Sequence, residues 1–244
     1  GEGSGIVTNC ARILKGMTPM QRPDFQLVIT EEPVKHLGML LRKFEQDHGV
    51  SFKAVENQVI TPSKKNWVGT HALNGMMQQI FERKSDDYLR LERNSWDSKL
   101  ICDVRVGTKV IQIKNDYVLG VYNGESGVVH ELNMELGSFT VDYGDRYVEY
   151  PVETDYETFD PDTGQMVKRY YNPQKNVELA YALTTHKCQG SEYKYVIYVM
   201  NKSMYGIQIR PNFYTGVSRA RTHVTLLSDS RSIMSALKRT ENKW

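Results

Sequence analysis

Segment 184–192 (TTHKCQGSE) concentrates hydroxyl, imidazole, ammonium and amide side chains between two apolar stretches that are typical of buried strands. Because ligands of open α/β sheets bind beyond the carboxyl ends of the strands, this loop is a candidate phosphate or sugar site. Gly190 would let its backbone approach a ligand closely. Taken alone, however, such a segment is more often an ordinary solvated loop, so its interpretation depends on the rest of the chain.

A second candidate is the arginine pair in segment 214–221 (YTGVSRAR). A planar guanidinium suits a phosphate group or the charge that develops during phosphoryl transfer. On a helix, Arg219 and Arg221 would face different directions, so that one reaches a ligand while the other meets solvent. The alternative is a surface salt bridge, which is the commoner use of an arginine without further context.

A third segment, 61–67 (TPSKKNW), places two lysines beside Trp67 in a loop. Point charges and a stacking face are the ingredients of single-strand nucleic-acid binding, although a proline turn with solvated lysines explains the same residues. Segment 160–164 (DPDTG) resembles the start of a calcium loop but lacks the distal Glu, which predicts a turn. The sequence contains no HExxH, no GxSxG and no metal-spaced pair of histidines.

Hydrophobic spacing predicts the elements that position these segments. Residues 33–44 and 70–80 carry apolar side chains at helical spacing, with Thr70 as the helix N-cap and Gly49 as a stop signal. The predicted buried strands are 59–60, 177–183 and 195–200, followed by a helix over 213–221, a strand over 223–227 and a closing helix over 230–238. This pattern indicates an α/β fold with a parallel sheet.

The middle of the chain has a different pattern. Residues 103–178 show period-two alternation, turn dipeptides such as Asn123-Gly124 and abundant tyrosine, which together favour a small antiparallel barrel. Tyr117 and Tyr122 are candidate stacking residues, although tyrosines on a small barrel are more often half-buried packing. We therefore predict three segments: 1–102, an inserted barrel at 103–178, and a return to the α/β fold at 179–244.

Composition restricts the class of protein. Lys and Arg number 31 against 29 Asp and Glu, a net charge of +2, so any basic surface must be local. Three cysteines without a CxxC pair exclude a disulfide framework and favour a reducing, cytoplasmic location. No apolar run approaches the roughly 20 residues of a membrane span, and Gly1 opens no signal peptide. The start without Met indicates a fragment of a longer protein.

These segments together resemble a known family. ELAYALTTHKCQGSEYKYVIYV resembles motif V of superfamily 1 helicases, and YTGVSRARTHVTLL resembles their motif VI. GTKVIQIKNDYVLGVYNGESGVV, preceded by VITPSKKNWVGTHALN, is similar to the RecD-like, 5′-to-3′ branch. The resemblance runs in the family's order from about residue 5 to residue 228. It implies a second RecA-like (P-loop NTPase-type) motor domain that carries an inserted SH3-like barrel.

The resemblance also implies roles for individual residues. Arg219 would be the motif VI arginine that reaches the γ-phosphate of ATP. Glu192 would contact the ribose, with Gln189 and Gly190 near the phosphates. The residues that would contact single-stranded DNA are Thr184 and His186, Thr61 and Lys64 from the other side of the groove, and, as further contacts, Asn115 and Lys187.

One departure from the family is informative. The chain lacks GxxxxGK[ST] and a recognisable acidic motif for magnesium, and the motif IV arginine expected near its start is also missing. ATP and Mg²⁺ would therefore be held mainly by a first RecA-like domain that precedes Gly1. We expect the C-terminal half of an ATP-dependent DNA helicase, with single-stranded DNA and that first domain as partners, and protein partners through the barrel. The alternatives are a non-catalytic nucleic-acid- or protein-binding module, the motor part of a relaxase–helicase fusion, and an RNA helicase.

Overall fold

The computed structural model describes residues 3–65, 68–82, 86–95 and 98–241. The chain forms two compact units, residues 1–81 with 181–244 and residues 82–180, so the second unit is one continuous insertion into the first. This insertion begins earlier than the predicted residue 103. The difference arises because strand β3 (Leu89–Ser95) pairs with β4 (Ser98–Val104) and contacts the short helix η1 (Pro173–Asn176), which places the hairpin in the second unit.

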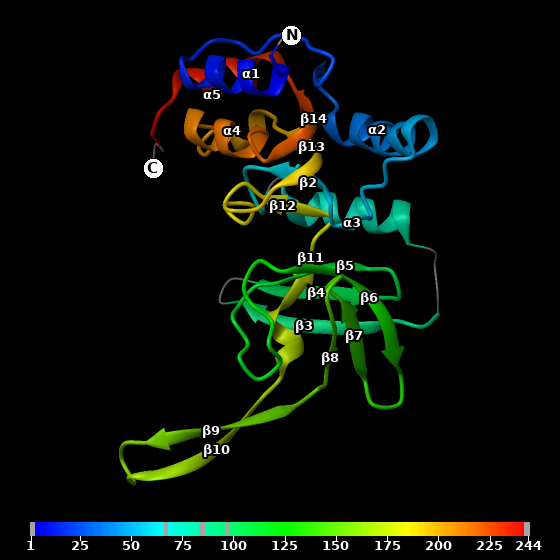
Figure 1. The fold of residues 1–244 in the computed structure, drawn as a ribbon, viewed down its shortest axis with the longest axis vertical. Coiled ribbons are helices and arrows are strands. Elements are labelled where there is room, and N and C mark those ends of the chain that lie inside the picture. Colours follow the sequence, from blue (N-terminus) through cyan, green and yellow to red (C-terminus); the bar gives the residue numbers. More distant parts are fainter. Residues whose placement is uncertain (1–2, 66–67, 83–85, 96–97, 242–244) are drawn as a thin grey trace. The chain divides into compact units, whose positions relative to one another are not determined.

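The first unit is built on a parallel sheet, as predicted. Its strands have the order β1-β14-β13-β2-β12, and every pairing is parallel. The strands are β1 (Phe25–Ile29), β2 (Asn57–Thr61), β12 (Ala182–Thr184), β13 (Tyr193–Val199) and β14 (Ala220–Ser228). Helices α1 (Gly5–Leu14), α4 (Arg210–Val217) and α5 (Ser230–Lys238) cover one face, and α2 (Pro33–His48) and α3 (Thr70–Phe81) cover the other (Figure 1).

The helix α2 illustrates how local sequence fixes these elements. Its apolar spacing places Leu37, Leu41 and Phe44 in the core, where each buried side chain contributes roughly 1.5–3 kcal/mol of burial free energy. Pro33 occupies the first turn, and Gly49 ends the helix in the left-handed conformation with φ +63°. The predicted stop at Gly49 is therefore confirmed, with the helix reaching His48 rather than Phe44.

Two predicted elements are corrected by the structure. The run 177–183 is two strands: β11 (Val177–Leu179) pairs antiparallel with β5 (Lys109–Gln112) in the second unit, whereas β12 pairs with β2 in the first. One apolar run thus contributes a strand to each of the two units. Hydrophobic spacing alone does not show where one strand ends and the next begins. The predicted helix 213–221 is α4, which ends at Val217, and β14 already begins at Ala220, where it pairs with Tyr193.

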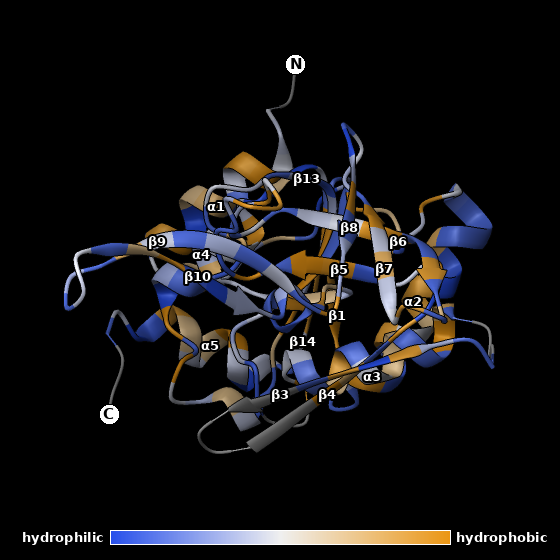
Figure 2. Ribbon diagram, turned by 90° about the horizontal axis from the view of Figure 1, so that it is seen from below, coloured by the Kyte–Doolittle hydropathy of each residue, from blue (hydrophilic) through white to orange (hydrophobic). Residues whose placement is uncertain are grey.

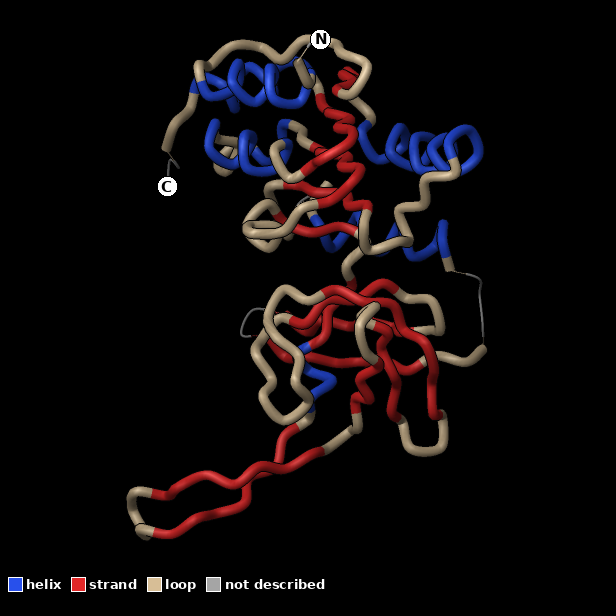
Figure 3. Tube along the Cα trace, viewed as in Figure 1, coloured by secondary structure: helices blue, strands red, loops and turns tan. Residues whose placement is uncertain are grey.

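The second unit is antiparallel and contains little helix within its described residues. Its main sheet has the order β11-β5-β6-β7-β8, with β6 (Ser126–Asn133), β7 (Ser138–Asp142) and β8 (Tyr147–Tyr150) joined by tight connections (Figure 3). Its core includes Val110, Val129, Phe139 and Tyr150. The predicted antiparallel character of this region is confirmed.

A separate hairpin extends from this sheet. Strands β9 (Thr154–Asp160) and β10 (Gln165–Tyr171) pair along seven residues and form a two-stranded sheet of their own. In Figure 2 the hairpin is largely hydrophilic, whereas β5 is hydrophobic. The turn predicted at 160–164 joins the two strands, with Gly164 at φ +68°. Among the described residues, no helix has the length and apolarity that crossing a membrane requires.

Candidate functional site

The loop 185–192 runs from the carboxyl ends of the strands of the parallel sheet (the carboxyl edge) to their amino ends (the amino edge). It begins after Thr184, which pairs with Thr61 at the carboxyl end of β2. It ends at Tyr193, two residues before Tyr195, which pairs with Asn57 at the start of β2. About six residue levels at 3.3 Å each separate these points, so the loop spans roughly 20 Å. The predicted position at the carboxyl edge is thus correct only for the first half of the loop.

At the carboxyl edge, the loop turns tightly on Thr184. The Thr184 hydroxyl accepts a hydrogen bond from the Lys187 N–H at 3.2 Å, and the Thr185 N–H donates to the Thr61 carbonyl at 3.0 Å. Thr184 itself is buried, whereas His186 is exposed and Lys187 half-buried. The turn therefore presents an imidazole and an ammonium group to solvent beside the ends of β2 and β12.

Thr61 has a different role from the one predicted. Its side chain is fully buried, and its hydroxyl lies 2.9 Å from the Val199 carbonyl and 3.1 Å from the Val68 carbonyl. A hydroxyl whose single proton is committed to these buried acceptors is not available to a nucleic-acid backbone. Thr61 joins the ends of two neighbouring strands, and the predicted DNA contact by its side chain is corrected.

Lys64 lies in the loop that leads into α3. The Ser63 and Lys64 carbonyls accept hydrogen bonds from the Thr70 and His71 N–H groups, which satisfies free donors of the first helical turn. A Cβ at Gly69 would lie 2.3 Å from the Lys65 carbonyl, so this close approach requires glycine. The Lys64 side chain is exposed. Trp67, the candidate stacking residue of this loop, lies outside the described residues.

At the amino edge, Arg219 lies between α4 and β14 and is half-buried. Its guanidinium donates to the Thr215 carbonyl at 3.1 Å, to the Ser191 carbonyl at 3.4 Å and to the Ser218 hydroxyl at 3.3 Å. Within the described part of the chain, no carboxylate forms an ion pair with it. Arg219 is therefore a positioned cation that is anchored by neutral oxygens alone.

The charge of Arg219 acts on its buried neighbours. Burial raises the pKa of the Cys10 thiol to about 11, and the nearby guanidinium of Arg219 partly opposes this rise. The same guanidinium opposes the increase in pKa that burial causes for Tyr193. The Arg219 charge therefore favours the anionic form of both neighbours, but burial outweighs it and both groups stay protonated.

The predicted nucleotide residues lie beside Arg219 in the second half of the loop. Gln189 and Gly190 are exposed, and Gly190 adopts φ +81°, a conformation that favours glycine. Glu192 is exposed and lies 3.7 Å from Arg221. The two arginines do face different surroundings, but they do so at the start of a strand, which corrects the predicted helix.

Two tyrosines of β13 that sequence reasoning missed support the loop from below. The Tyr193 hydroxyl donates to the Cys188 sulfur at 3.7 Å, and the Tyr198 hydroxyl lies 3.3 Å from the Thr185 hydroxyl. Burial raises the pKa of both tyrosines, so both remain neutral. The sequence signal for this role is that Tyr193 and Tyr198, whose hydroxyls need a hydrogen-bond partner when buried, occur in the largely aliphatic segment 193–199.

Asn115, a predicted DNA contact, belongs to the second unit. Its side-chain oxygen accepts from the Asn123 N–H at 2.9 Å, and its amide donates to the Tyr117 hydroxyl at 3.4 Å. Tyr117 and Tyr122 form an edge-to-face pair and are 78% and 48% exposed. Half-buried packing, the commoner expectation for such tyrosines, is wrong for Tyr117.

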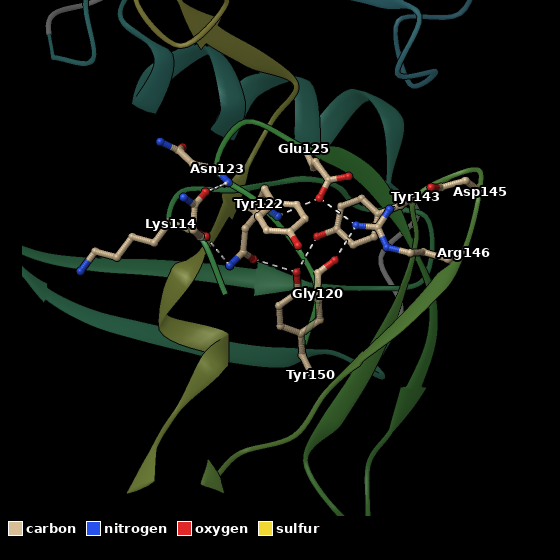
Figure 4. A network of polar contacts seen from close by, with 11 residues as sticks. Lys114, Gly120, Tyr122, Asn123, Glu125, Tyr143, Asp145, Arg146 and Tyr150 are labelled. Atoms are coloured by element: carbon tan, nitrogen blue, oxygen red, sulfur yellow. Dashed lines mark hydrogen bonds and ion pairs between the residues drawn. The ribbon is translucent and has the colours of Figure 1, made fainter. Parts of the chain in front are cut away.

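A polar network fixes the base of the loop 113–125, which joins β5 to β6 and carries Asn115, Tyr117 and Tyr122 (Figure 4). One guanidinium nitrogen of Arg146 donates to Glu125 at 2.8 Å and to the Gly120 carbonyl at 2.9 Å. Beneath it, the Tyr150 hydroxyl donates to the Gln112 side chain at 2.8 Å, and the Gln112 amide donates to the Lys114 carbonyl at 2.9 Å. The loop therefore has a defined shape despite its exposed tip.

A metal site would require several ligating side chains in one place. Among the described residues, no group of three or more His, Cys, Asp or Glu side chains has a suitable arrangement. The amino edge fits a nucleotide, because the Arg219 guanidinium, which has no ion-pair partner among the described residues, lies there beside the exposed loop that contains Gly190. These residues suit a phosphate group, whereas the described carboxylates do not form a magnesium site.

Residues 179–227 match the family model of the UvrD-like helicase C-terminal domain. The chain is 32% identical over 164 residues to the ATP-dependent RecD2 DNA helicase of Deinococcus radiodurans, covering 67% of this chain and 19% of that protein. It is 29% identical over 134 residues to the RecBCD enzyme subunit RecD of Mycolicibacterium smegmatis, covering 55% of this chain and 20% of that protein.

Solved structures share the fold. The Pif1 helicase from Bacteroides in complex with ADP-AlF3 and ssDNA superimposes with a TM-score of 0.55 at 18% identity, covering 96% of this chain and 51% of that chain. Pif1 helicase from Candida albicans gives a TM-score of 0.52 at 15% identity, over 95% of this chain and 55% of that chain.

The parallel sheet, the motif order and these relatives define one class of protein, the superfamily 1 helicases. Within this class, the chain contains a RecD-like helicase C-terminal domain. It spans about a fifth of the length of the curated relatives just named.

Proposed function

We propose that this chain is the C-terminal half of an ATP-dependent DNA helicase that translocates on single-stranded DNA. The first unit would be the second RecA-like motor domain, and the second unit an inserted SH3-like barrel. The observation that carries the proposal is the course of loop 185–192. It starts beside the exposed Lys64 and His186 and the half-buried Lys187 at the carboxyl ends of the strands, and it ends against Arg219, which has no ion-pair partner among the described residues, at their amino ends.

At the amino edge, Arg219 would stabilise the negative charge that develops on the γ-phosphoryl group. Its contacts to the Ser191 and Thr215 carbonyls hold the guanidinium in place before the nucleotide arrives, so little reorganisation is required. Gln189 and Gly190 would lie near the phosphates, and Glu192 would exchange its exposed pairing with Arg221 for the ribose hydroxyls. An exposed ion pair of this kind contributes little, so its loss costs little.

At the carboxyl edge, His186, Lys187 and Lys64 would contact the DNA strand. The turn at Thr184 presents the first two, and the loop before α3 presents the third. Because the same eight-residue loop ends beside Arg219, a displacement at the nucleotide edge would be transmitted to the DNA edge through a continuous, tyrosine-supported segment. Asn115 of the second unit would add a further contact.

ATP and Mg²⁺ would be held mainly by a first RecA-like domain of the same parent protein. Bound ATP supplies the phosphoryl group whose hydrolysis drives closure and opening between the two domains. The present chain would contribute the arginine and one part of the DNA groove, and the barrel would guide the strand or bind protein partners. We place the parent protein in the cytoplasm.

The decisive test is the substitution Arg219→Ala in the longer protein that contains this chain. We expect DNA-stimulated ATP hydrolysis to fall by about 10³-fold or more, as for other arginines that contact a transferring phosphoryl group. Single-stranded DNA binding should change less than about threefold, because the DNA residues lie at the opposite edge. Arg221→Ala is the matched control, since it removes the same charge two residues away, and it should retain most of the activity.

The isolated chain provides a second test. Because it contains no GxxxxGK[ST] sequence, we expect purified residues 1–244 to hydrolyse no ATP above background while binding single-stranded DNA weakly and in a salt-sensitive manner. Robust turnover by this chain alone would refute the assignment. An unchanged ATPase rate in Arg219→Ala, with DNA binding intact, would instead favour a non-catalytic nucleic-acid-binding module.

A further inference from the structure

A separate open pocket of about 390 Å³ lies in the first unit between helix α5 and the segment that follows β13. Its walls are Tyr205, Ser230, Arg231, Met234, Ser235, Lys238 and Arg239. Five of these residues follow helical spacing along one face of α5, and Arg239 follows directly after the helix. None of the motifs described above includes any of these residues.

The pocket is lined by cations and has no acidic wall. Arg231, Lys238 and Arg239 contribute positive charge, and no carboxylate belongs to the lining that the described residues form. Neither Arg231 nor Lys238 forms an ion pair within the described part of the chain. The neighbouring Asp229 is buried and directs its oxygens to the N–H and hydroxyl of Ser232. The local charge is therefore uncompensated.

Two buried polar atoms of the lining lack a hydrogen-bond partner. The Ser235 hydroxyl and the Nε of Arg239 are both inaccessible to solvent and unpaired among the described residues. The rest of the Arg239 guanidinium is fixed, since it donates to the Tyr205 carbonyl and lies 4.2 Å from the centre of the Tyr205 ring. Buried donors without partners are uncommon in native proteins, and here they accompany a cationic wall. Because these two atoms are inaccessible to solvent, they do not form part of the pocket surface, and it is the exposed Arg231 and Lys238 side chains that suit a ligand with anionic oxygens.

The position of the pocket indicates which anion it binds. Ser230 and Arg231 begin α5 directly after the carboxyl end of β14, and Tyr205 follows the carboxyl end of β13. The segment between the end of β13 and Tyr205 packs on the end of β2, because the Thr61 hydroxyl lies 3.5 Å from the Met204 sulfur. The pocket therefore continues the sheet edge that presents Lys64 and His186. Tyr205 is 60% exposed and presents part of a ring at the mouth.

We propose that this pocket is a further binding site for the phosphodiester backbone of the single strand, with Arg231 and Lys238 as the phosphate-contacting residues. Arg239, stacked on Tyr205, would add positive charge beside the strand. The inference rests on the proposed function, because it extends the DNA path already assigned to the carboxyl edge. It lengthens that path from β12 and β2 across β13 to β14.

The test measures binding of residues 1–244 to fluorescein-labelled oligothymidylate by anisotropy, from about 20 to about 200 mM salt. The double variant Arg231→Gln/Lys238→Gln removes two exposed charges without changing the half-buried Arg239. For two lost phosphate contacts, the slope of log affinity against log salt should become shallower by about 1.4, with affinity at low salt several-fold weaker. The matched control is Arg42→Gln/Lys43→Gln on α2, which removes two exposed charges from the opposite face of the sheet. It should change the affinity less than about twofold.

The outcomes separate this inference from the proposed function. If the wild-type chain binds DNA and His186→Ala weakens binding while Arg231→Gln/Lys238→Gln does not, the pocket site is wrong and the proposed function stands. Equal losses in both double variants would reduce the effect to bulk charge and also overturn the site. A wild-type chain that binds no single strand at low salt would contradict the proposed function itself.

A second measurement identifies the source of the phosphate. Acetylation of Lys238 by a lysine-reactive ester, followed by mass spectrometry, should be suppressed by oligothymidylate, while Lys43 reacts at an unchanged rate. Inorganic phosphate at the same phosphate concentration should protect Lys238 far less, because it lacks neighbouring phosphates on one strand. Equal protection by inorganic phosphate would show a simple anion site and overturn the assignment to a strand.

Discussion

The contact between Gly216 and Tyr198 gives the sharpest test of how the two halves of the site are held together. Gly216 lies in α4 and is buried, and a Cβ at this position would fall 2.0, 2.5 and 2.9 Å from three ring atoms of Tyr198. The ring is fully buried, and its hydroxyl contacts the Thr185 hydroxyl and the Asn212 carbonyl. Gly216→Ala must therefore displace either the helix that precedes Arg219 or the ring that supports loop 185–192.

The magnitude follows from two opposing effects. Overpacking a well-filled core costs about 1–3 kcal/mol, and the severity of this overlap places Gly216→Ala at the upper end. Replacing a helical glycine by alanine recovers about 1 kcal/mol of helix propensity. We therefore expect a net destabilisation of about 2 kcal/mol, which corresponds to a decrease in Tm of roughly 4–8 °C for a unit of this size.

Far-UV circular dichroism at the helical band is the appropriate assay, since the α-helices among the described residues all belong to the first unit. Gly75→Ala is the matched control. Gly75 lies in α3 and is exposed, and no atom lies within 4 Å of the point that its Cβ would occupy, so this substitution should raise stability by about 0.5–1 kcal/mol. The double variant Gly216→Ala/Tyr198→Leu should show a coupling free energy of about 1 kcal/mol or more relative to the two single variants.

A Gly216→Ala variant as stable as the Gly75→Ala variant would refute the packing argument. Additivity of Gly216→Ala and Tyr198→Leu would do the same, because it would show that the alanine methyl group and the ring do not compete for space. In the longer protein, a stable Gly216→Ala variant with wild-type DNA-stimulated ATPase would separate this contact from the coupling between the two edges.

Two further predictions concern ionisable groups. Burial lowers the pKa of His223 from its ordinary value of 6.5, so near and below pH 6.5 the unfolded chain binds a proton that the folded chain does not. The free energy of unfolding should therefore decrease as the pH falls through 6.5, by at most about 1.4 kcal/mol per pH unit. Urea unfolding at about pH 7.5 and about pH 5.5 should show this loss, and His223→Phe should reduce it; an identical pH dependence in the variant would exclude His223 as its source. Burial raises the pKa of Cys10 to about 11 and that of Cys102 to about 12, so iodoacetamide at about pH 8 should modify neither in the folded protein, whereas both should react in urea. Rapid native alkylation of either thiol would contradict the structure.

Much of the local structure follows from sequence alone. The helical spacing of Leu37, Leu41 and Phe44 and the glycine at position 49 define α2 without reference to the rest of the chain. Turn chemistry likewise defines the hairpin connection at 160–164. These features depend on interactions within a few residues, which a linear pattern records.

Other features depend on pairing between distant residues. Residues 177–183 read as one strand, yet Leu179 and Ala182 belong to different sheets, because their partners are β5 and β2. The linear pattern leaves the hydroxyl of Thr61 free for a ligand, but carbonyls from β13 and from the loop before α3 enclose it. Burial of this kind is decided by segments that are remote in sequence.

The sequence by itself determined the class of this protein, since the order of polar segments and strands around Arg219 and His186 is a property of the linear chain. Only the tertiary structure decided that these two residues lie at opposite edges of one sheet and are connected by loop 185–192. It also decided that Arg231 and Lys238 of α5 line a pocket at the same edge as His186. The physical reason is that strand pairing sets the position of each loop, and strand pairing is a long-range interaction that residue spacing does not encode.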